Sequence, residues 1–251
     1  NGFFLKFENS TSLGLDSSVN TNNFTVNGTP TQTVDTPANV FATFNPLARN
    51  ASNTYSNGNT TYDYSGSYQK TGSSSLGMSD GKYYAEFKIG SGGQTVEFGI
   101  VADNFVSDGR TVTDTGASHT YDMRGHTGTI CLITYGLQDV YVDGSDTGTN
   151  VDFTTTTGDI VMIAFDATTK KIWFGKNGTW SNSGNPSTDT SPFLTYSGTG
   201  NAPFHFAVGT QNTAPISANF GNGYFGTTAV ASATTDESGT GIFEYDVPSG
   251  Y

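Results

Sequence analysis

Residues 164–180 read AFDATTKKIWFGKNGTW, and no other stretch constrains the architecture of this chain as strongly. The stretch predicts a strand, a tight turn from Asp166 to Lys170, a second strand and an Asn177-Gly178 turn. Ile172 and Phe174 alternate with polar or amphipathic side chains, which is the two-residue period of a half-buried strand. Asn-Gly supplies the positive φ angles that a two-residue turn needs. None of these side chains is chemically reactive, so the stretch favours binding or assembly over catalysis.

The composition also predicts an all-β protein. The 251 residues include 32 Gly, 18 Phe and 13 Tyr, and only 13% of them are charged. Large β-forming side chains separated by short polar turns are typical of a sandwich or barrel. The chain is long enough to bury a sizeable core, and no helical pattern extends beyond a turn or two.

The net charge argues against a nucleic-acid partner. It is −12, and the ten Lys and Arg residues are scattered, whereas phosphate binding needs clustered cations. No apolar run approaches the length that spans a membrane, so we expect no membrane insertion. The chain begins with Asn1 rather than Met, and a strand is predicted directly at this end, at residues 3–7. We therefore expect a processed product or a slice of a longer polypeptide.

The single cysteine, Cys131, lies in the apolar stretch 129–135. No intrachain disulfide can form, and reactive thiols need exposure and nearby positive charge. We therefore expect Cys131 to be a buried core residue.

Strand signals become dense after residue 80. Residues 81–89 alternate cleanly. A glycine-rich turn at 90–93 then leads into a second strand signal at 95–102, which predicts a hairpin by its spacing. Further strands are predicted at 129–135, 138–143, 160–166, 170–176, 204–209, 216–221 and 241–245.

The order of these motifs resembles that of SPRY domains, over roughly residues 78–222. The motifs that carry the resemblance are Gly81–Ile89, Val96–Ala102, Asp166–Gly178, Pro203–Gly209 and Asn219-Phe220-Gly221. The resemblance implies an all-β fold, an antiparallel β-sandwich of the concanavalin-like jelly-roll type. It also implies an interaction module without catalysis, in which binding loops lie at one end of the sandwich.

The flanking segments resemble tail-fibre and other virion proteins of marine bacteriophages. The matching stretches are Phe3–Ser10, Leu13–Ser18, Asn22–Val26, Asp35–Asn39, Phe41–Leu47 and Phe243–Tyr251. This resemblance implies a protein of the virion surface, and it does not reveal the ligand. We expect residues 1–50 to be an N-terminal β segment packing on the sandwich, 51–225 the SPRY-like sandwich and 226–251 a closing segment, together one compact unit.

Two carboxylates offer a catalytic alternative. In the predicted hairpin Glu86 and Glu97 face each other, with Cβ atoms about 5 Å apart, and glycosidases use paired carboxylates. The structural alternative is that Glu86 is hydrogen-bonded to a neighbouring strand or to Arg. The residues favour this structural interpretation.

The loop Asp143–Asp152 carries carboxylates and other oxygen donors, which could hold Ca²⁺. It lacks the ligand spacing of a dedicated calcium loop, and Asp-Gly is equally good turn chemistry. We therefore expect no cofactor, with Ca²⁺ as the open alternative.

The polar insertion at 103–128 is the densest mixture of donors, aromatic rings and ionisable groups in the chain. Such a surface suits sugar hydroxyls or a protein partner. A partly exposed Trp180 could add a stacking platform, although a Trp folded over the sandwich edge is commoner. The candidate binding residues are Arg110, His119, Tyr121, Asp122, Arg124, His126 and Trp180.

These observations predict a non-enzymatic virion protein on a tail fibre or capsid. Its expected partners are other virion proteins and a host-surface glycan or protein, and a homo-oligomer, plausibly a trimer, is expected. Two alternatives stay open: a glycan-degrading depolymerase that uses Glu86 and Glu97, and a purely architectural cement protein.

Overall fold

The chain forms two compact units, residues 1–39 and 40–251. The computed structural model describes residues 2–30, 32, 40–47, 53–66, 70–91, 95–103, 123–134, 136–211 and 213–251. The predicted boundaries at 50 and 225 mark no division between units, because residues 40–47 and 226–251 belong to the second one. That residues 1–50 pack on the sandwich stays a prediction.

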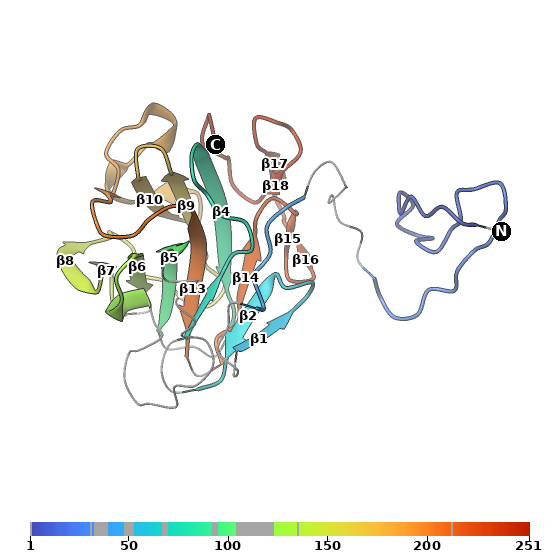
Figure 1. Ribbon diagram of the computed structural model, residues 1–251, viewed down its shortest axis with the longest axis horizontal. Coiled ribbons are helices and arrows are strands. Elements are labelled where there is room, and N and C mark those ends of the chain that lie inside the picture. Colours follow the sequence, from blue (N-terminus) through green and yellow to red (C-terminus); the bar gives the residue numbers. More distant parts are fainter. Residues whose placement is uncertain are drawn as a thin grey trace. The chain divides into compact units, whose positions relative to one another are not determined.

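The second unit contains an eight-stranded antiparallel sheet (Figure 1). Seven of its strands follow one path, and an eighth, β12 (Leu194–Thr195), pairs with β10. The path runs through β1 (Asn53–Ser56), β2 (Thr61–Tyr64), β14 (Ile216–Asn219), β4 (Lys82–Ile89), β9 (Ile160–Asp166), β10 (Lys171–Lys176) and β11 (Thr179–Trp180).

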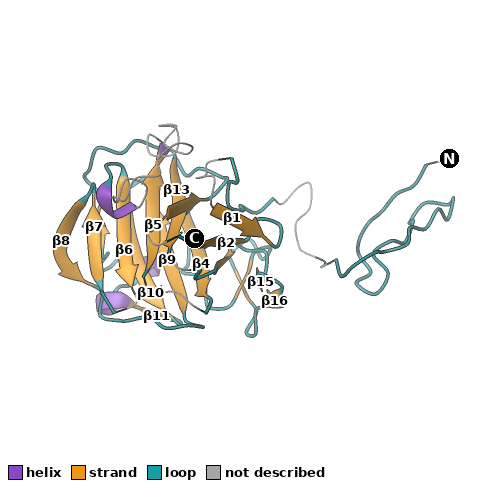
Figure 2. Cartoon of the chain, turned by 90° about the horizontal axis from the view of Figure 1, so that it is seen from below, coloured by secondary structure: helices purple, strands orange, loops and turns teal. Residues whose placement is uncertain are grey.

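A six-stranded antiparallel sheet forms the other layer, and Figure 2 shows its strands β8 to β5 side by side. Its order is β3 (Lys70–Ser73), β13 (Phe204–Thr210), β5 (Val96–Ala102), β6 (Thr129–Thr134), β7 (Asp139–Val142) and β8 (Ser145–Asn150). Two short hairpin pairs are β15 (Tyr224–Phe225) with β16 (Thr228–Ala229), and β17 (Thr234–Thr235) with β18 (Ile242–Phe243). Three short 3₁₀ helices are η1 (Met123–Gly125), η2 (Ser181–Ser183) and η3 (Pro186–Thr188). The predicted all-β antiparallel sandwich is confirmed.

The turn chemistry predicted for residues 164–180 is confirmed. Strands β9 and β10 pair in register, and β10 turns back into β11. Asn177 and Gly178 have φ angles of 48° and 84°, as a two-residue hairpin turn requires. The Asn177 side chain also accepts a hydrogen bond of 2.8 Å from the Ile160 backbone N–H, which ties the turn to the start of β9.

The hairpin predicted at residues 81–102 is wrong. Strand β4 pairs with β9 and β14 in one sheet, and β5 pairs with β13 and β6 in the other. The connection therefore crosses from one layer to the other. A short glycine-rich link suits either path, and the apolar alternation is the same in both, so local sequence does not distinguish them.

Aromatic rings fill the space between the sheets. Phe87 on β4 lies 5.9 Å from Phe98 on β5, 6.2 Å from Phe206 on β13 and 5.8 Å from Phe220, measured between ring centroids. Phe44 adds a ring 5.7 Å from Phe220. Full burial of one such side chain contributes about 1.5–3 kcal/mol, and this cluster joins the two layers.

The outer face of each sheet is also covered. On the eight-stranded sheet Tyr84, Met162 and Trp173 pack against Phe243 and Tyr245 from the C-terminal segment. On the six-stranded sheet an apolar cluster gathers around η1, formed by Val101, Met123, Cys131, Ile133 and Ala207. Cys131 is buried, as predicted.

The first unit has little regular structure. Among residues 2–30 the β-type pairing is limited to an isolated bridge between Leu5 and Asp16, so the strand predicted at residues 3–7 is wrong. Instead, the Asp16 carboxylate organises this unit by accepting hydrogen bonds from the backbone N–H groups of Phe4, Ser18 and Asn22, each at 2.8 Å.

We predict that Gly99→Ala destabilises the sandwich by about 3 kcal/mol, because overpacking a core costs this much. Gly99 lies in the middle of β5, and an added Cβ would overlap the backbone carbonyl of Ile130 on β6. Urea denaturation measures the loss. Ser145→Ala on the exposed edge strand β8 is the control and should change stability by less than about 0.5 kcal/mol. Equal midpoints for both variants would contradict the packing argument.

Candidate functional site

Asp143 organises the loops at one end of the six-stranded sheet. It occupies the β7–β8 turn with a φ of 48°. Its Oδ1 accepts hydrogen bonds from the Gly128 N–H at 2.7 Å and the Tyr196 hydroxyl at 2.8 Å, and its Oδ2 accepts one from the Thr199 N–H at 2.7 Å. One carboxylate thus holds three loops that are distant in the sequence.

The hydrogen bonds around Asp143 change the acidity of both groups. Burial alone would raise the pKa of the Asp143 carboxyl, but the bonds from Thr199, Tyr196 and Gly128 outweigh burial and lower that pKa below its ordinary value. Burial, together with the bond to Asp143, raises the pKa of the Tyr196 hydroxyl. Asp143 is therefore a charged acceptor and Tyr196 a neutral donor at neutral pH.

Further backbone bonds complete this end of the sandwich. The Ala102 N–H donates to the Gly128 carbonyl at 2.7 Å, and the Asp103 N–H donates to the Pro203 carbonyl at 2.9 Å. Residue 103 and the ranges 123–128, 143–144 and 196–203 thus form one connected surface, which we call the loop end.

The structure places the predicted site residues in different regions. Arg124 and His126 lie at the loop end and are half-buried. Burial raises the pKa of the Tyr141 hydroxyl on β7, and the nearby positive charge of Arg124 offsets part of that rise. The other predicted residues of the insertion, Arg110, His119, Tyr121 and Asp122, lie outside the described residues.

Trp180 does not belong to the loop end. It lies on the outer face of the eight-stranded sheet, where its ring meets Tyr84 at 6.2 Å in an edge-to-face contact. Arg124 follows Met123, which packs on the outer face of the six-stranded sheet. Trp180 is half-buried and packs with the C-terminal segment. This agrees with the alternative that Trp180 folds over the sandwich instead of forming an exposed stacking platform.

The predicted pairing of Glu86 with Glu97 is wrong. Their strands belong to different sheets. Glu86 points outward beside Tyr84, and Glu97 points to the opposite outer face, where its Oε2 accepts a 3.3 Å hydrogen bond from the Met123 N–H. Both residues are fully buried. Two carboxylates on opposite faces of a sandwich cannot flank one glycosidic bond.

Glu86 is a structural acceptor. It receives bonds from the Tyr84 hydroxyl at 2.9 Å and the Asn219 amide at 3.2 Å. The backbone N–H groups of Glu244 and Tyr245 also donate to it, each at 2.9 Å. Burial raises the pKa of the Glu86 carboxyl, and these four bonds offset part of that rise. The carboxylate therefore fastens the C-terminal segment to the sheet.

The acidic loop Asp143–Asp152 uses its oxygens internally. Asp143 binds the loop end, Asp146 accepts from the Gly148 N–H at 2.8 Å, and Asp152 accepts from the Asn182 N–H at 3.0 Å. Among the described residues no three His, Cys, Asp or Glu side chains gather in a metal-binding arrangement.

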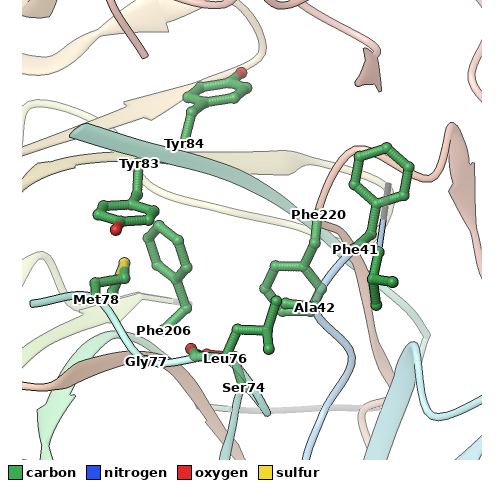
Figure 3. Close-up of a pocket in the computed structure, with 11 residues that line it drawn as sticks. Phe41, Ala42, Ser74, Leu76, Gly77, Met78, Tyr83, Tyr84, Phe206 and Phe220 are labelled. Atoms are coloured by element: carbon green, nitrogen blue, oxygen red, sulfur yellow. The ribbon is translucent and has the colours of Figure 1, made fainter. Parts of the chain in front are cut away.

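A small apolar pocket lies beside the loop end (Figure 3). Its volume is about 180 Å³, and Gly77 in its wall packs closely against Pro203. Figure 3 shows Tyr83 and Phe206 side by side in the pocket, whereas the Tyr84 ring points away. The lining residues are Val40, Phe41, Ala42, Ser74, Leu76, Gly77, Met78, Tyr83, Tyr84, Phe206 and Phe220.

The sequence did not predict the pocket, the hydrogen bond from Tyr196 or the role of Asp143. The pocket walls come from separate segments around residues 41, 76, 83, 206 and 220, so no local sequence motif predicts the pocket. Asp143 carried the right local signal, an Asp-Gly turn, but its hydrogen-bond partners depend on the tertiary fold.

Comparison with solved structures identifies the architecture. The chain matches the SPRY domain of human HERC1 with a TM-score of 0.50 and 15% sequence identity, over 70% of this chain and 96% of that one. It matches the PSpry domain of TRIM65 with a TM-score of 0.52 and 12% identity, over 71% and 89% of the two chains. The fold is SPRY-like. The resemblance inferred from the motif order is confirmed at the level of fold.

Stonustoxin is a further structural match, with a TM-score of 0.50 and 13% identity, over 71% of this chain and 27% of that one. No protein-family model matches the chain, and no curated protein matches its sequence. At these identities the likeness concerns architecture, so function has to be argued from the site. Within the described part of the chain, no helix has the length and apolarity to cross a membrane.

We predict that Glu86→Gln loosens the C-terminal segment. A glutamine offers one acceptor oxygen, so at least one of the four donors would face an amide N–H instead, at a cost of about 2 kcal/mol. Hydrogen exchange at the amides of Glu244 and Tyr245 should accelerate. Glu8→Gln, at an exposed carboxylate, is the matched control. Unchanged protection at both amides would contradict the role assigned to Glu86.

We predict that Asp143→Asn destabilises the sandwich at neutral pH by about 1–3 kcal/mol. The amide has one acceptor oxygen, so its NH₂ group would face either the Thr199 donors or the donors of Gly128 and Tyr196. A lowered pKa in the folded state means that the carboxylate stabilises the fold above its ordinary pKa of about 3.9. This stabilisation is lost as the pH falls through the lowered value. Thermal denaturation from neutral to acidic pH should therefore show the two proteins converging below about pH 4.

Asp146→Asn is the control for this comparison, since Asp146 lies on the exposed strand β8. A difference between wild type and Asp143→Asn that persists at acidic pH would contradict the assignment.

Proposed function

We propose that this protein is a non-enzymatic bacteriophage virion protein whose SPRY-like sandwich binds a host-surface glycan or protein through its loop end. The main support for this proposal is the Asp143 carboxylate, which holds three loops together through its hydrogen bonds. Rigid loops on a sandwich bind with a smaller loss of conformational entropy than mobile ones. The loop end thus has the property that a recognition surface needs.

The chemistry of the loop end supports polar recognition. Arg124 and His126 are half-buried there, so each combines a packed stem or ring with a polar group. A guanidinium offers five N–H donors in a planar fork, which match carboxylate and hydroxyl oxygens. Such oxygens are abundant on bacterial polysaccharides and on acidic protein surfaces.

The positions and hydrogen bonds of the acidic side chains support a binding function over hydrolysis. Glu86 and Glu97 lie on opposite faces, and Glu86 and Asp143 are occupied by structural hydrogen bonds. The proposed virion setting rests on the flanking segments, which resemble phage virion proteins. A net charge of −12 also suits a protein that stays soluble at the surface of a particle.

A second candidate function is attachment to neighbouring virion proteins. The apolar pocket favours it, because its walls carry no charged side chain. An engineered apolar cavity of about 150 Å³ holds a benzene ring, so this pocket has the size for one aromatic or branched side chain of a protein partner.

We predict that Arg124→Ala with His126→Ala weakens binding to purified host-surface polysaccharide at least tenfold, about 1.4 kcal/mol. Glycan-array binding and calorimetry with the full chain measure the loss. Lys88→Ala is the matched cationic control, because Lys88 lies on β4 of the eight-stranded sheet, opposite Ser217 on β14, whereas the loop end belongs to the six-stranded sheet. Melting temperatures of both variants separate a loss of binding from a loss of stability.

Saturable binding that survives the double substitution would contradict the loop end as the site. Absence of binding to host glycans and host proteins, together with binding to purified virion proteins, would favour the architectural alternative. Release of new reducing ends from the polysaccharide by wild-type protein would overturn the non-enzymatic proposal.

A further inference from the structure

The first unit displays an unusual amount of apolar surface. Among the described residues of the whole chain, eleven large hydrophobic side chains are exposed, and seven of them lie between residues 3 and 26. Phe3, Phe4 and Phe7 are each more than half exposed, and Phe24 is 47% exposed. The others are Leu15, Val19 and Val26.

This unit is too small to bury these side chains itself. Chains below about 40 residues rarely form an adequate hydrophobic core without disulfides, metals or association. Residues 1–39 contain no cysteine. Polar bonds to Asp16 order its backbone, and the rings of Phe3 and Phe24 meet at 4.7 Å, but both rings stay exposed. Burial of these side chains therefore requires a surface outside the unit.

Charge indicates which partner covers this surface. Residues 1–39 carry one lysine against three carboxylates, a net charge of −2, whereas residues 40–251 carry nine cationic and nineteen acidic residues, a net charge of −10. Copies of the sandwich repel one another. Among residues 2–30, however, Lys6 and Glu8 pair at 3.8 Å and Asp16 is buried, so the exposed apolar side chains there lie beside few unpaired charges and identical copies of this surface can meet with little repulsion.

We propose that the first unit is a self-association module, in which Phe3, Phe24 and their apolar neighbours pack against the same residues of a second copy. Apolar, weakly charged surfaces are complementary to themselves, and closed symmetric oligomers are the common result of such contacts. The inference names the surface for oligomerisation and is independent of what the loop end binds.

The first test is the association state of the full-length chain, measured by sedimentation equilibrium from low to high micromolar concentration. Wild-type protein should form an oligomer. Phe3→Ser with Phe24→Ser should raise the dissociation constant about 100-fold, because each lost ring removes a tenfold or larger contribution. Leu137→Ser, at a comparably exposed apolar residue of the sandwich, should leave association unchanged.

A second test does not disturb the fold of the unit. The aromatic photo-crosslinker p-benzoyl-phenylalanine replaces Phe3, and light- and heavy-isotope copies are mixed before irradiation. Crosslinks between light and heavy chains within residues 2–30 would support the proposal. A monomeric wild type, or crosslinks confined to single chains, would overturn it, and the second outcome would mean that the chain covers its own aromatic residues.

Discussion

Buried and half-buried carboxylates that accept hydrogen bonds from backbone N–H groups hold the irregular segments of this protein in place. Segments outside a sheet leave such groups without partners, and burying them unpaired is costly. Glu86 satisfies two N–H groups of the C-terminal segment, Asp143 binds the loop end, and Asp16 orders the first unit. A charged acceptor forms bonds about twice as strong as a neutral one, so a few acidic residues organise large stretches of chain.

This use of carboxylates separates the sandwich into covered and available surfaces. The C-terminal segment covers one outer face around Tyr84 and Trp173, and η1 covers part of the other above Cys131. These covered parts of the two faces contribute to stability. The loop end and the adjoining pocket are left as the places where side chains of several segments converge on an accessible surface, which is where binding residues concentrate in sandwich folds.

The elements that sequence analysis predicted correctly are those fixed by local chemistry. The Asn177-Gly178 turn defines the β10–β11 hairpin because few other dipeptides adopt its φ angles. The link between β4 and β5 has no such constraint, so its crossing between sheets depended on distant partners, β13 and β14. The candidate site was less predictable for the same reason. Arg124 and His126 were proposed from the composition of the polar insertion, whereas the partners of Asp143 and the walls of the pocket come from segments far apart in the sequence.

The two proposed contact surfaces differ in chemistry, and this difference bears on their roles. The first unit is apolar and weakly charged, which is the character of permanent interfaces between identical subunits. The loop end is polar and built on hydrogen bonds, which is the character of interfaces that form and dissociate. Joining several copies through the first unit would place several loop ends on one particle. Individually weak contacts with a repetitive host surface would then combine into firm attachment, because each additional contact forms at a high effective concentration.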